Sequence, residues 1–178
     1  MVRSLKQSFP LSLVIVMFSG LLYIVVQQDM RTAANDPQIQ IAEDFAVRLE
    51  NGETPEIVNQ MTKVDMTKSL APFVSVYDSG GKLLVSNAVL DGGVPSVPVG
   101  VLEYAKTHGK HTVTWQPRPG VRNAVVVEPY KGVQSGYVVV GRSLREIEKR
   151  EEQLTLQIGI GLFAMLLTIF VVQKVFKA

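Results

Sequence analysis

Two long apolar runs, one near each end of the chain, constrain this sequence more than any other feature. Residues 9–26 (FPLSLVIVMFSGLLYIVV) contain no charged residue, and residues 154–172 (LTLQIGIGLFAMLLTIFVV) carry only Gln157 as a strongly polar member. A helix rises about 1.5 Å per residue, so either run nearly crosses a hydrocarbon core of about 30 Å. The pattern predicts transmembrane helices at 9–26 and 154–172.

The charges outside the two runs predict the orientation of the chain. Each terminal tail, 1–8 and 173–178, carries two basic residues and no acidic one. The segment 27–153 therefore holds all 16 acidic residues and 14 of the 18 basic ones, which gives it a formal charge of −2. By the positive-inside rule both tails are cytoplasmic and 27–153 is extracytoplasmic, in a two-pass protein of the cell membrane.

Each run has one alternative interpretation. The first run follows a basic segment, as a cleaved signal peptide does, but it is longer than the usual apolar region of about 7–15 residues. The nearest approach to a cleavage site is Thr32-Ala33-Ala34. The second run could be a buried core helix, although Gly159 and Gly161 within an almost unbroken apolar stretch are more typical of a membrane span.

The composition of the segment between the runs excludes some classes of function. The chain has no cysteine, so disulfides and thiol chemistry are excluded, while the redox compartment stays open. A slightly acidic domain outside the cell is a poor partner for nucleic acid. The basic tails set the topology and contact membrane lipid without forming a strong lipid site.

A helical pattern follows the first run. Residues 37–50 place Ile41, Phe45 and Leu49 at i, i+4 and i+8, which predicts an amphipathic helix. Before it, Asn35-Asp36-Pro37 predicts either a kink or a restart, because proline lacks an amide donor and suits the first turn of a new helix. A second short helix is expected with Thr54 as its cap and Pro55 in its first position.

From residue 73 the hydrophobic period changes from helical to extended. A short helix is expected at 101–107, and a last helix is expected to run from Ser143 into the second span. The predicted fold is α+β, a five-stranded antiparallel sheet with a long N-terminal helix, flanked by two transmembrane helices. The expected strands are 73–77, 82–87, 111–116, 123–130 and 136–140.

Two strings beside the runs carry a resemblance to a known family. ANDPQIQIAEDFA after the first run and VVVGRSLREIEKRE before the second, together with the order of elements, are similar to extracytoplasmic PAS-like sensor domains of the single Cache type. Such domains belong to bacterial histidine kinases and chemoreceptors of two-component signal transduction. The resemblance implies a PAS/Cache-like fold. The family's amino-acid-binding motif of Tyr, Arg, Trp-Tyr and Asp has no match here.

One group of polar and aromatic residues suggests a ligand site. Trp115, Arg122, Tyr130 and Tyr137 lie on the last three predicted strands and their connections. In a PAS-like domain the sheet and its helices enclose a pocket, where an arginine with aromatic side chains would hold a small anionic or carboxylated ligand. The alternative is that the aromatic residues belong to the core or its rim and that Arg122 is a surface charge in a turn.

No sequence pattern indicates an enzyme. The chain lacks G-x-S-x-G, a P-loop, HExxH and any thiol. His108 and His111 flank a Gly-Lys turn with no carboxylate nearby, which is more typical of surface histidines than of a metal site. We therefore expect no enzymatic activity, no cofactor and no metal.

The expected function is a membrane-anchored extracytoplasmic sensor or small-ligand-binding module that signals through a partner protein. Only QKVFKA follows Val172, so we expect the output to come from a membrane partner, a histidine kinase or a chemoreceptor, with a homodimer as another arrangement. The alternative is a structural or assembly subunit of a membrane complex, whose PAS-like domain makes protein–protein contacts.

Overall fold

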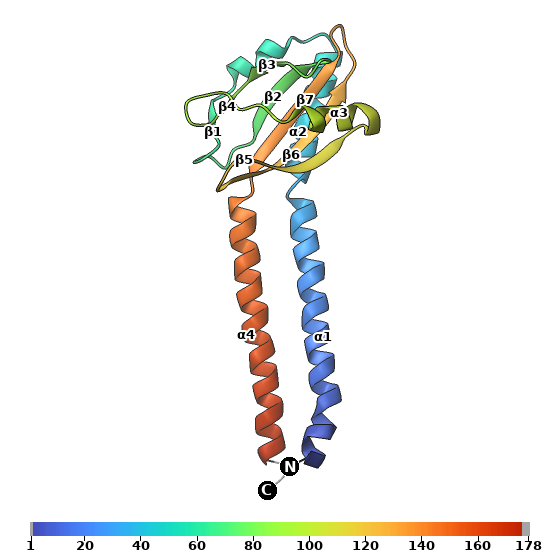
Figure 1. Cartoon of the computed structure of the whole chain (residues 1–178), viewed down its shortest axis with the longest axis vertical. Coiled ribbons are helices and arrows are strands. Elements are labelled where there is room, and N and C mark those ends of the chain that lie inside the picture. Colours follow the sequence, from blue (N-terminus) through green and yellow to red (C-terminus); the bar gives the residue numbers. More distant parts are fainter. Residues whose placement is uncertain (1, 176–178) are drawn as a thin grey trace. The chain divides into compact units, whose positions relative to one another are not determined.

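The computed structural model (Figure 1) describes residues 2–175. Side chains are described from residue 9 onward. These residues form two compact units. One contains nearly all of the helices α1 (Val2–Ala33) and α4 (Arg145–Val175), and the other is the globular unit Ala33–Arg145, which takes the last residue of α1 and the first residue of α4. The ends of the two predicted cytoplasmic tails, residues 1 and 176–178, lie outside the described residues.

Two helices are long and apolar enough to cross a membrane, which fits a two-pass membrane protein. The mean hydropathy of the most apolar window is 2.4 in the N-terminal helical segment and 2.3 in α4. Only 6% of the first window and 0% of the second is buried, whereas the core helix of a soluble protein would be mostly buried. Large apolar side chains such as Phe18, at 65% exposure, and Phe163, at 68%, are therefore available to lipid.

The least exposed side chains of α1 and α4 recur at spacings of three and four residues. This is the spacing of a seam between two packed helices. On α1 the stripe includes Ser12, Ile15, Ser19, Tyr23, Val26 and Met30, and on α4 it includes Glu151, Leu154, Ile158, Leu162, Leu166 and Ile169. Two polar contacts also join the helices. Arg31 Nε donates to Glu151 Oε1 at 2.8 Å, and Thr155 Oγ1 lies 3.5 Å from the Tyr23 hydroxyl.

The globular unit is built on a five-stranded antiparallel sheet, which confirms the predicted α+β class and the long N-terminal helix. The strand order is β3-β2-β7-β6-β5. The strands are β2 (Phe73–Asp78), β3 (Leu83–Ser86), β5 (His111–Arg118), β6 (Val121–Tyr130) and β7 (Gly136–Ser143).

Both faces of this sheet are covered. Val126, Val138 and Val140 pack on one face beneath α2 (Asp36–Glu50) and the 3-10 helix η1 (Pro55–Gln60). Successive side chains of a strand point to opposite faces, so their neighbours Val125 and Val139 pack on the other face. That second face is covered by α3 (Val99–His108), through Leu102 and Ala105, and by the chain between residues 64 and 97.

The helix boundaries decide between the kink and the restart predicted at Asn35-Asp36-Pro37, and they correct the predicted short helix after Thr54 and the predicted start of the last helix. The chain restarts at Asp36, because a turn at Ala34 and Asn35 separates α1 from α2. The short element after Thr54 is a 3-10 helix. The last helix begins at Arg145 rather than Ser143, because Ser143 still pairs with Asn123 in the sheet.

A second, two-stranded parallel sheet was not predicted. It joins β1 (Val64–Asp65) to β4 (Ala88–Val89), and each strand is too short to show a period in the sequence. The Asn87 side chain connects it to the main sheet, since its Oδ1 accepts the Val74 N–H at 2.7 Å and its Nδ2 donates to the Thr62 carbonyl at 3.0 Å.

Gly141 of β7 lies where a side chain has no room. A Cβ there would lie 2.3 Å from Cζ of Phe73 and 3.0 Å from Cγ2 of Val125. We expect Gly141→Ala to lower the free energy of unfolding by about 1–3 kcal/mol. The measurement is urea denaturation of the full chain, followed by the fluorescence of Trp115, the single tryptophan.

The matched control is Gly100→Ala in α3, where a Cβ would meet nothing within 4 Å. An alanine inside a helix is expected to leave stability unchanged or to raise it by up to about 1 kcal/mol. Equal stability of the two variants would contradict the close packing of Phe73 on Gly141.

Candidate functional site

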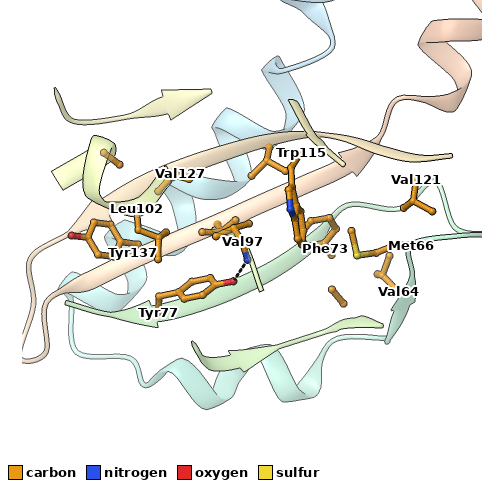
Figure 2. Close-up of a cluster of buried hydrophobic side chains, with 14 residues drawn as sticks. Val64, Met66, Phe73, Tyr77, Val97, Leu102, Trp115, Val121, Val127 and Tyr137 are labelled. Carbon is orange, nitrogen blue, oxygen red and sulfur yellow. Dashed lines mark hydrogen bonds between the residues drawn. The ribbon is translucent and has the colours of Figure 1, made fainter. Parts of the chain in front are cut away.

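Two of the four predicted site residues, Trp115 of β5 and Tyr137 of β7, lie in the core on the α3 face (Figure 2). The Trp115 ring meets the Phe73 ring edge-on, with 6.3 Å between the ring centroids. Tyr137 is 5% exposed and belongs to the same buried cluster as Leu102. Both positions fit the alternative that these aromatic residues serve the core.

A buried tyrosine hydroxyl fastens the covering loop to this face. The hydroxyl of Tyr77 accepts the Val97 N–H at 3.0 Å, drawn as a dashed line in Figure 2. Burial raises the pKa of Tyr77, and the hydrogen bonds from Ser96 and Val97 partly offset this effect. The interaction holds the segment before α3 against the sheet.

The sheet register separates Tyr130 and Arg122 from the other two. Trp115 pairs with Asn123, and Tyr137 pairs with Pro129, so the odd-numbered residues of β6 share their face. Arg122 and Tyr130 have even numbers and therefore point to the opposite face. Tyr130 is 3% exposed beneath α2, while Arg122 is exposed at the start of the strand. The structure does not bring the four together, and ligand binding by this set stays a prediction.

A cleft opens on the α2 face, and Tyr130 lines it. Its volume is about 310 Å³, which is at the small end of the range for small-molecule sites. One wall is the end of α2 and the loop that leads into η1, and the other is the connection between β6 and β7. The lining consists of Leu49, Gly52, Glu53, Thr54, Pro55, Glu56, Tyr130, Val133 and Gln134.

Tyr130 reaches across the neighbouring strand. It pairs with Gly136 of β7, and a Cβ on Gly136 would lie 3.0 Å from the Tyr130 hydroxyl and 2.1 Å from the Tyr77 carbonyl oxygen. Glycine is therefore required where the ring crosses β7. The hydroxyl is buried and has no hydrogen-bond partner among the described residues. Burial raises the pKa of Tyr130, and the charge of Asp78 adds to this effect.

Two carboxylates lie in the cleft lining, and their surroundings differ. Glu53 forms an ion pair with Arg48, with 2.8 Å between Oε2 and the guanidinium Nη2. Glu56 has no ion pair among the described residues, and a hydrogen bond from the Thr54 side chain lowers its pKa. Glu56 is consequently ionised at neutral pH and presents its charge without a partner cation.

Other ionisable groups lie away from the cleft. Lys110 pairs with Glu43 of α2 at 2.5 Å, and burial raises the pKa of nearby Glu128, an effect that the Lys110 charge opposes. The centroids of the His108 and His111 rings lie 4.1 and 4.3 Å from the centroid of the Tyr104 ring. Among the described residues no group of three or more His, Cys, Asp or Glu could hold a metal ion.

No protein-family model and no curated protein matches the chain. An apolar floor, a charged carboxylate and an unpartnered hydroxyl are groups that bind and orient a small molecule.

Sequence reasoning found Tyr130 but missed the rest of the cleft. Glu53 and Glu56 flank the predicted Thr54-Pro55 helix start. That prediction places both residues near a loop but does not indicate which other residues lie near them. They line the same cleft as Tyr130 because α2 packs on β6 and β7, a tertiary contact that no local pattern encodes.

A substitution tests whether the Tyr130 hydroxyl forms a hydrogen bond in the folded protein. Tyr130→Phe keeps the ring over Gly136 and removes a buried hydroxyl that has no partner among the described residues. We expect the free energy of unfolding to rise by about 1 kcal/mol, because an unsatisfied buried polar group destabilises the folded state. A loss of stability of about 1 kcal/mol or more in urea denaturation would mean that the hydroxyl is bonded in the folded protein.

Proposed function

We propose that the protein is a membrane-anchored sensor or small-ligand-binding module that signals through a partner protein. The observation that carries the proposal is the cleft beside Tyr130, which has the volume and the mixture of apolar and polar groups of a small-molecule site. Two candidate spans on either side of the globular unit in the chain support a module that works at a membrane.

The two walls of the cleft belong to elements that lead along the chain into the candidate spans. The wall formed by α2 follows α1 after a turn at Ala34 and Asn35. The β6–β7 wall leads through β7 and Leu144 into α4. A ligand that favours one separation of the two walls would bias α2 and β7 together.

Arg145, the first residue of α4, belongs to the globular unit and forms hydrogen bonds within it. The Arg145 guanidinium donates to the carbonyls of Thr67 and Lys68 at 3.2 and 3.0 Å. The Leu144 N–H donates to the Arg122 carbonyl at 2.9 Å. Movement of β7 would therefore be passed to the first residue of α4 without a flexible linker.

The finer assignment is also part of the proposal. The order of helices and strands supports a PAS-like domain of the single Cache type. The basic residues of the tails 1–8 and 173–178 support cytoplasmic termini and a globular unit outside the cell. The partner would be a membrane protein of two-component signalling, such as a histidine kinase or chemoreceptor. A small ligand would then act from outside on a protein that produces the response inside.

A metabolite library tests this function directly. The full chain in lipid nanodiscs is incubated with each compound and followed by thermal shift and hydrogen–deuterium exchange. We expect a binding compound to protect the amides of 49–56 and 130–136, which form the two walls of the cleft. The expected protection is several-fold, because closing the walls suppresses local opening.

Two tryptophan variants distinguish the cleft from other surfaces. Gln134→Trp fills the cleft at an exposed lining position and should abolish the protection. Lys106→Trp on the exposed surface of α3 is the control and should leave it unchanged. If no compound changes thermal stability or exchange, the sensor proposal fails and an assembly subunit that binds another protein becomes the better account.

A further inference from the structure

The charge of the cleft differs from that of an anion site. Its lining contains Glu53 and Glu56 but no lysine or arginine. Arg48, beside the cleft, is already paired with Glu53 at 2.8 Å. Arg122, on which the expectation of an anionic ligand rested, is not a lining residue. The uncompensated charge at this site is therefore negative.

The floor of the cleft is suited to an apolar body. Leu49 is 4% exposed and Tyr130 is 3% exposed, and both line the cleft with Pro55. The face of a tyrosine ring also attracts cations through its quadrupole. A molecule with an apolar body and a positive head would satisfy the floor and the carboxylate together.

A second observation at the cleft is independent of its charge. Tyr130 is almost completely buried, yet its hydroxyl has no partner among the described residues. Buried polar groups in folded proteins nearly always have a hydrogen-bond partner. A ligand that inserts between the loop before η1 and the β6–β7 connection would supply one.

We propose that the cleft binds a small organic amine, whose ammonium group donates to the Glu56 carboxylate and to the Tyr130 hydroxyl and whose apolar body packs against Leu49 and the Tyr130 ring. This inference rests on the proposed ligand-binding function and names the ligand class of the same site. The cleft volume of about 310 Å³ limits the ligand to a compact molecule rather than a peptide chain.

A matched pair of probes tests the charge of the ligand. The full chain in nanodiscs is titrated with 2-phenylethylamine and with 3-phenylpropionate, which share an apolar body and carry opposite charges at neutral pH. We expect the amine to bind and to raise the thermal midpoint, and we expect the carboxylate to have no effect at the same concentration.

Single substitutions then assign the contacts. Glu56→Gln removes the charge at nearly constant size and should weaken amine binding about 10-fold or more, because it removes a charge-assisted hydrogen bond. Tyr130→Phe should weaken it several-fold. Glu103→Gln removes an exposed carboxylate from α3 and is the control that should leave the affinity unchanged.

Each result decides between the inference and the function on which it rests. Amine binding that survives Glu56→Gln, binding of the carboxylate alone, or no binding of the amine would each overturn the inference. The sensor proposal would still stand if the carboxylate or another library compound protected the cleft walls. It would fail only if no compound bound at all.

Discussion

The three middle strands of the sheet, β2, β7 and β6, are buried on both faces, and the other elements of the globular unit are arranged around this constraint. An antiparallel sheet usually leaves one face to solvent. Here Val125 and Val126 are both 0% exposed, although they are neighbours in the chain and point in opposite directions. Helix α2 must therefore cover one face, and α3 with the chain from 64 to 97 must cover the other.

The same constraint determines where the globular unit leaves a cleft. The α3 face is closed by Trp115, Phe73 and the Tyr77–Val97 hydrogen bond. On the α2 face, the end of α2 and the β6–β7 connection leave a cleft at the edge of the packed region. Tyr130 joins the cleft to the sheet, because its ring crosses β7 at Gly136. A ligand there would act on α2 and β7, which lead along the chain into the two candidate spans.

The sequence predicted the elements better than their contacts. Runs such as 73–77 and 136–140 have local β character, and each became part of a strand. The grouping of Trp115, Arg122, Tyr130 and Tyr137 depended on which side chains share a face. That depends on register, since a shift of one residue moves every side chain to the other face. The pairing of Tyr130 with Gly136 and the short strands β1 and β4 arise from tertiary contacts that no local pattern shows.

The proposed function requires that the globular unit lies outside a membrane that α1 and α4 cross. Because the chain has no cysteine, single cysteines can report on this directly. Lys106→Cys lies on an exposed face of α3, and Lys174→Cys lies at the end of α4. Intact cells are treated with a membrane-impermeant maleimide. The account predicts that the Lys106→Cys variant is labelled in intact cells and that the Lys174→Cys variant is labelled only after lysis. Labelling of the Lys174→Cys variant in intact cells would contradict it.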